Sequence, residues 1–119
     1  MAVESVPAGC VLDAAGALAR FGGDRGLFVE MAGFFFEDAP VLFADLRRAV
    51  DGKDSPAIRM TAHALKGLVA GCGGVRAANA AQKVENAGQE ANLANISPLV
   101  DSLGEELDRL KQALLVYCA

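Results

Sequence analysis

The only histidine of the 119-residue chain, His63, lies in the segment TAHALKG at residues 61–67. On a helix, residues three and four positions apart share a face, so Lys66 and Gly67 would lie beside the imidazole. This face would combine a nucleophile suited to neutral pH, a fixed positive charge and a glycine that leaves the backbone uncovered. These three properties suit the handling of a phosphoryl group.

The apolar residues of the expected helix lie on the face opposite His63. At about 100° of rotation per residue, five of them and Thr61 fall between about 140° and about 240° from the histidine. Arg59, Lys66, Gly67 and Ala70 fall within about 60° of it. Because an apolar stripe faces the core, His63 is predicted to point outward. The six residues opposite it are Ile58, Thr61, Leu65, Leu68, Val69 and Cys72.

An outward histidine conflicts with a core-filling role, and one histidine supplies too few ligands for a metal site. An idle surface histidine and an exposed nucleophile remain as interpretations. Gly67 bears on the choice, because glycine inside a helix costs about 1 kcal/mol relative to alanine. Either close helix packing compensates for that cost, with Gly71 four residues further on, or a partner must approach the backbone beside His63.

A second helix could supply a group that orients the imidazole. If the chain reverses near Gly74, residues equidistant from that glycine lie side by side, and His63 and Glu85 are each eleven positions away. A carboxylate at Glu85 could accept a hydrogen bond from Nδ1–H, which would leave Nε2 free to attack. The alternative is that Glu85 and Lys83 form a charged surface rim.

The rest of the chain predicts an all-α domain, an antiparallel four-helix bundle with a short extra N-terminal helix. Hydrophobic residues make up 53% of the sequence and aromatic residues 6%, and no stretch alternates with a period of two. We expect a loose lead-in over residues 1–10 and one bundle domain over residues 11–119. The expected helices cover residues 11–20, 24–50, 55–71, 75–87 and 97–117.

Short local signals set the expected helix ends. Asp24 and the pairs Ser55–Pro56 and Ser97–Pro98 are predicted N-caps. Pro40 predicts a kink or a restart in the second helix, and Gly88 is predicted to end the fourth. The residues expected to face the core are Leu27, Phe28, Met31, Phe34 and Phe35 in the second helix and Leu99, Leu103, Leu107, Leu110, Leu114 and Tyr117 in the last.

Charge and composition exclude several classes of partner. A net charge of −4 argues against nucleic acid, and the apolar stretches are far too short to span a membrane. Cys10, Cys72 and Cys118 lack metal-ligand spacing and no signal peptide is evident, so we expect free thiols in the cytoplasm. We also expect a monomer. The initiating Met1 favours a complete chain or one with an added start, the alternative being the end of a longer hybrid sensor kinase.

The segment around His63 closely resembles the signature of the histidine-containing phosphotransfer (HPt) domain family. That signature reads A-H-x-L-K-G, then five variable residues and a glycine, followed on the next helix by an apolar residue and Glu or Gln. The chain has AHALKG at residues 62–67, Gly73, and the pair Val84–Glu85. The order of the expected helices also fits, so the resemblance covers nearly the whole chain.

The resemblance implies a four-helix bundle with an exposed phospho-accepting histidine at His63. It implies further that Lys66 stabilises the phosphate, that Gly67 gives clearance for docking, and that Glu85 hydrogen-bonds the imidazole. Arg59, on the same face, could add positive charge. The expected function is a phosphorelay intermediate, which takes a phosphoryl group from a receiver-domain aspartate or a sensor kinase and passes it to a response regulator.

No cofactor of its own is expected. Magnesium would belong to the partner receiver, since the sequence shows no acidic cluster on the His63 face. No nucleotide-binding glycine motif is present either, so autonomous kinase activity is not expected. The rival hypothesis is a module of the same fold that docks a receiver or kinase without carrying phosphate. In both cases Met60 and Ala64 are the nearest candidates for an apolar docking surface.

Overall fold

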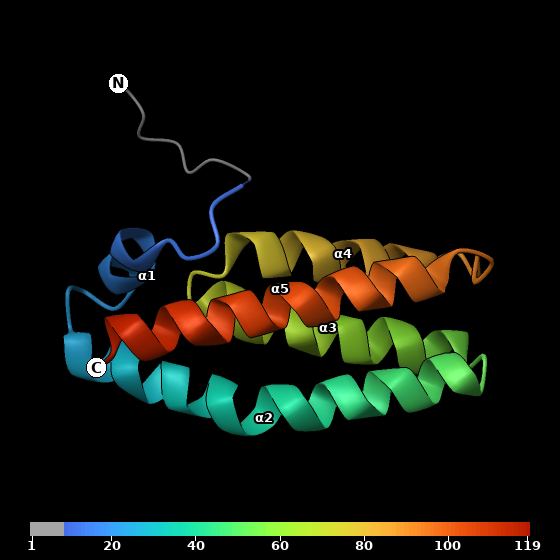
Figure 1. Ribbon diagram of the computed structural model, residues 1–119, viewed down its shortest axis with the longest axis horizontal. Coiled ribbons are helices and arrows are strands. Elements are labelled where there is room, and N and C mark those ends of the chain that lie inside the picture. The colour runs from blue at the N-terminus through green and yellow to red at the C-terminus, as the bar shows by residue number, and fades with distance from the viewer. Residues whose placement is uncertain (1–8) are drawn as a thin grey trace.

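A computed structural model describes residues 9–119, which contain five helices and no strand. Four of these helices are long. They lie side by side along the longest axis, with the short helix at the end where the first long one begins (Figure 1). Successive long helices run in opposite directions, which confirms the predicted antiparallel bundle. Residues 1–8 of the expected lead-in lie outside the described range. The helices are α1 (Ala14–Arg20), α2 (Arg25–Asp51), α3 (Ser55–Gly71), α4 (Val75–Gln89) and α5 (Ile96–Tyr117).

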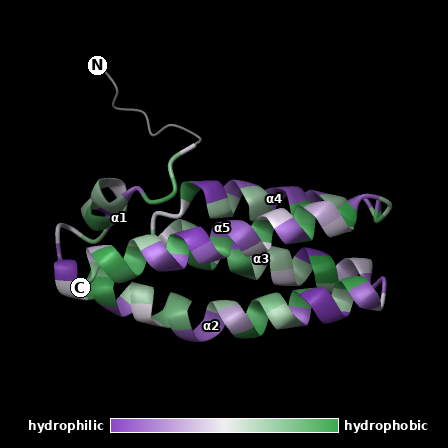
Figure 2. Cartoon of the chain, viewed as in Figure 1, coloured by the Kyte–Doolittle hydropathy of each residue, from purple (hydrophilic) through white to green (hydrophobic). Residues whose placement is uncertain are grey.

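The hydrophobic core lies between the four long helices. Hydrophobic and hydrophilic residues interleave along each of them, as amphipathic helices require (Figure 2). Complete burial of each large apolar side chain contributes about 1.5–3 kcal/mol to the stability of the fold. The largest fully buried side chains are Phe28, Leu46, Ile58, Leu65, Leu103, Leu110 and Leu114.

The apolar face of α2 is narrower than the sequence predicts. Phe28 and Phe35 are buried, whereas Met31 is half-buried and Leu27 and Phe34 are exposed. Alanines complete the buried stripe of α2. The alanines on it are Ala32, Ala39 and Ala49.

Two of the predicted helix caps are wrong. The cap of α3 is Asp54, whose carboxylate accepts a hydrogen bond from the backbone N–H of Ala57, so Ser55 is already helical. Asp54 lies one residue before Ser55, and its carboxylate satisfies a backbone N–H of the first turn that would otherwise lack a partner. The last helix begins after Asn95 without a side-chain cap, so Ser97 lies inside it.

Three other boundaries also differ from expectation. The first helix starts at Ala14, because Asp13 caps it, rather than at residue 11. Helix α2 continues through the exposed Pro40 without a restart. Gly88 lies inside α4, which ends at Gln89. No helix among residues 9–119 has the length and hydropathy needed to cross a lipid bilayer.

The contact between α3 and α4 is unusually close. A Cβ atom on Gly88 would lie 2.8 Å from the backbone nitrogen of Arg59, so only glycine fits there. The turn between the helices is equally restricted. Gly73 has φ of 81°, its carbonyl accepts a hydrogen bond from Asp13 at 2.7 Å, and a Cβ on Gly74 would lie 2.5 Å from Leu110. We call this contact, with its turn, the α3–α4 seam.

Candidate functional site

His63 stands at the midpoint of α3 and points into solvent, with 64% of its side chain exposed. The outward direction predicted from the helical periodicity is therefore confirmed, and a core-filling histidine is excluded. Of the six residues predicted on the opposite face, four are buried and two, Thr61 and Leu68, are half-buried. The four buried residues are Ile58, Leu65, Val69 and Cys72.

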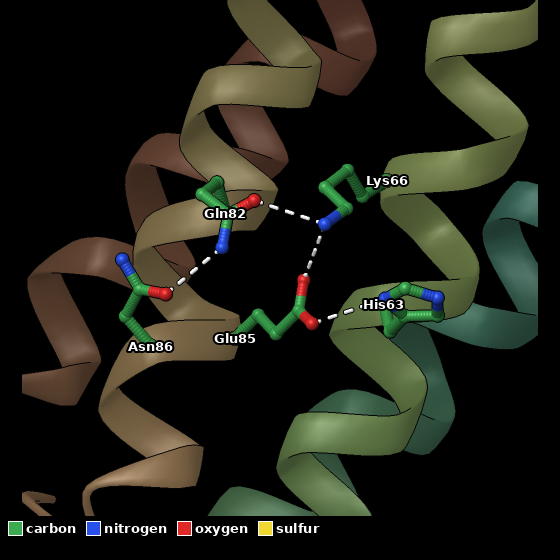
Figure 3. A network of polar contacts seen from close by, with 5 residues as sticks. All are labelled: His63, Lys66, Gln82, Glu85 and Asn86. Carbon is green, nitrogen blue, oxygen red and sulfur yellow. Dashed lines mark hydrogen bonds and ion pairs between the residues drawn. The ribbon is translucent and has the colours of Figure 1, made fainter.

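Glu85 reaches across the α3–α4 seam to the imidazole. Its Oε2 lies 3.0 Å from Nδ1 of His63, as Figure 3 shows, so the side-by-side arrangement predicted from Gly74 is confirmed. The glutamate is only 8% exposed, whereas Lys83 is exposed. Glu85 is therefore not part of a charged surface rim with Lys83.

Lys66 lies one turn beyond His63 and is held in place by α4. Its ammonium nitrogen is 2.9 Å from Oε1 of Glu85 as an ion pair, and it donates a hydrogen bond of 2.9 Å to Oε1 of Gln82. The Gln82 amide nitrogen donates in turn to Oδ1 of Asn86 at 2.8 Å. His63 and Lys66 are thus joined through one carboxylate, and Gln82 and Asn86 extend this network along α4 (Figure 3).

The pKa of Glu85 is lowered from its ordinary value of 4.5, chiefly by the Lys66 ammonium. Burial of the carboxyl opposes this shift, and the contact with His63 adds to it. At neutral pH the glutamate is therefore a carboxylate, which can only accept hydrogen bonds. Nδ1 of His63 must then be the donor, and the neutral ring carries its lone pair on the exposed Nε2.

The surface beside the imidazole is bare on the side of Gly67. A Cβ on Gly67 would meet nothing within 4 Å among residues 9–119, so helix packing does not explain this glycine. At Gly71, by contrast, a Cβ would lie 2.5 Å from Cε of Met31, the flexible end of that side chain. Met60, with 62% exposure, and Ala64 are exposed nearby, as expected for a docking surface. An approaching partner would meet backbone at Gly67 and apolar surface around it.

The residues of the polar network around His63 differ in part from those predicted. Arg59 is exposed on α3, and within residues 9–119 no ion pair joins it to the site. Gln82 and Asn86, in contrast, belong to the network although sequence reasoning missed them. The equidistance rule that pairs His63 with Glu85 also pairs Lys66 with Gln82, each eight positions from Gly74, so the signal for Gln82 was present.

Comparisons with known proteins agree with this geometry. Residues 30–113 match the family model described as the Hpt domain. A solved structure with a similar fold is histidine-containing phosphotransfer protein B from Pseudomonas aeruginosa PAO1, with a TM-score of 0.84 and 19% sequence identity. The similarity covers 92% of this chain and 96% of that one, and at this identity it shows a shared fold. None of the curated proteins matches the sequence.

Proposed function

The chain belongs to the Hpt domain family and is a phosphotransfer intermediate of two-component signalling, and we propose that His63 carries the phosphoryl group. One observation supports this assignment above the others. The buried Glu85 carboxylate, 3.0 Å from Nδ1, fixes the tautomer that exposes the Nε2 lone pair to solvent. An idle surface histidine would need no such partner.

In the proposed reaction, Nε2 of His63 attacks the phosphorus of an aspartyl phosphate on a receiver domain. The N–P bond forms as the P–O bond to the aspartate breaks, and the aspartate carboxylate leaves with the electron pair. Nδ1 keeps its proton, so the phosphorylated ring is positively charged and the Glu85 carboxylate stabilises that charge. Attack by the aspartate of a second receiver reverses these bond changes and restores the neutral imidazole.

Positive charge on the same face offsets the phosphoryl oxygens. Lys66 is the main source, because it lies one turn from His63 and is fixed by Glu85. Arg59, on the preceding turn of the exposed face, adds a weaker and less localised contribution. Gly67 gives the partner access to the reacting atoms, and Met60 with Ala64 forms the apolar part of the docking surface.

We assign the remaining chemistry to the partner proteins. Magnesium would be held by the receiver, and within residues 9–119 no group of three His, Cys, Asp or Glu side chains is arranged as a metal site. The partners are receiver domains and a sensor histidine kinase, and the chain acts as a monomer without kinase activity of its own. The cytoplasm fits the three free thiols of Cys10, Cys72 and Cys118.

The test is transfer of labelled phosphate from a phosphorylated receiver domain. We expect the wild type to take the label and His63→Gln to take none. Lys83→Gln, which removes an exposed positive charge from α4, is the matched control and should be labelled like the wild type. Equal labelling of wild type and His63→Gln would overturn the assignment. A wild type that binds the receiver without being labelled would instead be a docking module.

A further inference from the structure

The ammonium group of Lys66 has one donor to spare. A lysine ammonium offers three N–H donors and no acceptor. One faces Oε1 of Glu85 and one is donated to Oε1 of Gln82, each at 2.9 Å. The third is left for a group that arrives on the exposed face of α3, where His63 stands.

The Gln82 side chain is oriented for this contact. An ammonium can only donate, so the atom of Gln82 that faces Lys66 must be the carbonyl oxygen. The amide nitrogen at the other side of the group donates to Oδ1 of Asn86 at 2.8 Å, one turn further along α4 (Figure 3). The lysine therefore sets which end of the Gln82 amide faces it, and the contact with Asn86 agrees with that orientation.

The ion pair with Glu85 favours the present position of the Lys66 side chain even when a phosphoryl group is bound at His63. Oε1 of Glu85 is buried, and among residues 9–119 the Lys66 ammonium, 2.9 Å away, is the one group that compensates its charge. If Lys66 swung fully onto the phosphoryl oxygens, this charged oxygen would be left buried and uncompensated, which is unfavourable. The lysine must therefore act from its present position.

We propose that Gln82 is a positioning residue for phosphoryl transfer, which acts through Lys66. Together with Glu85 it anchors two donors of the ammonium, and the third N–H is presented to the phosphoryl group on His63. The inference rests on the proposed function of His63. It differs from a role in docking, in which a half-exposed Gln82 would touch the receiver directly.

Three variants separate these roles. Gln82→Met keeps the side-chain length and removes the oxygen, Gln82→Glu keeps an oxygen facing Lys66, and Gln89→Met changes an exposed glutamine of α4 as the matched control. Transfer rates are measured over a range of phosphorylated-receiver concentrations. For Gln82→Met we expect the maximal rate to fall about tenfold, with little change in the half-saturating concentration. Gln82→Glu and Gln89→Met should transfer at close to the wild-type rate.

A double-mutant cycle with Lys66→Met completes the test. If Gln82 acts through the lysine, Gln82→Met should cause no further loss in the Lys66→Met background. An undiminished loss there, or a change confined to the half-saturating concentration, would overturn the inference. If the wild type takes label and Gln82→Met takes it equally fast, only the Gln82 inference fails. If the wild type takes no label, the proposed function fails with it.

Discussion

The α3–α4 seam and the contact between α2 and α5 are built in opposite ways within one bundle. At the seam, Gly88 brings two backbones so close that no side chain fits between them. Between α2 and α5, by contrast, lies an open hollow of about 720 Å³, lined in part by Phe36 and Phe43, and the Arg47–Asp101 ion pair of 3.1 Å joins the two helices beside it.

This difference explains where the polar network is found. His63, Lys66, Gln82 and Glu85 reach one another with contacts near 3 Å, which requires backbones held at a fixed spacing. The seam provides that spacing because Gly88 packs directly against the backbone of Arg59. Flexible aromatic side chains between α2 and α5 can shift into the hollow, so that contact could not hold a network to the same accuracy.

The largest effect is expected when one glycine is replaced by alanine in the α3–α4 seam and one in the contact between α2 and α5, and the stabilities of the two variants are compared. Gly88→Ala should lower the free energy of unfolding by about 1–3 kcal/mol, because the backbone of Arg59 cannot move away. Gly104→Ala places a Cβ 2.9 Å from the ring tip of Phe43, which can tilt into the hollow. The better helix propensity of alanine, about 1 kcal/mol, should then offset most of the strain. Urea denaturation measures the free energy of unfolding of both variants, and equal destabilisation would contradict the proposed difference between the two contacts.

A smaller effect is expected on acidification. The pKa of Glu85 is lowered in the folded state, so its contribution to stability is complete above the unfolded value of 4.5 and is lost as the pH falls through the folded value. The free energy of unfolding should therefore decline less steeply below about pH 5 in Glu85→Gln than in the wild type. Asp101→Asn, in the exposed Arg47–Asp101 pair, should follow the wild-type slope. Parallel slopes for wild type and Glu85→Gln would contradict this expectation.

The smallest change in stability is expected at Gly67, where the seam opens to solvent. Gly67→Ala should raise the free energy of unfolding by about 0.5–1 kcal/mol, because a Cβ there meets nothing. Gly67→Gln should keep the fold and block phosphotransfer by covering the backbone beside His63. Gly33→Ala, at an equally open position on α2, should stabilise without slowing transfer. Wild-type transfer by Gly67→Gln would refute the clearance argument.

Much of the site could be predicted because it depends on only two regularities. Helical periodicity places His63 opposite the core stripe, and the position of one turn places Glu85 beside it. The same turn predicts Gln82 beside Lys66, but its contact also requires side-chain torsions that fix the direction of an amide. Asn86 adds a second such torsion, which no sequence spacing specifies.

The boundaries that were mispredicted depend on tertiary contacts or on competition between neighbours. Gly88 reads as a helix end, yet it continues α4 because another backbone packs against it. Asp54 and Ser55 are both good caps, and the choice between them is made by where the preceding turn leaves the chain. Pro40 is exposed and α2 continues through it, so this proline does not end the helix.

The restricted turn at Gly73 and Gly74 also determines which face of α4 is turned towards α3, and so whether Gln82 and Glu85 face His63 and Lys66. One residue inserted directly after Gly74 would rotate all of α4 by about 100° and carry Glu85 and Gln82 away from α3 together. The same insertion between α2 and α3 would leave that orientation intact. The uninterrupted stretch from Arg59 to Gly88, which includes the closely packed backbone as well as the turn, is therefore the smallest piece that could be transplanted to another bundle with its chemistry in register.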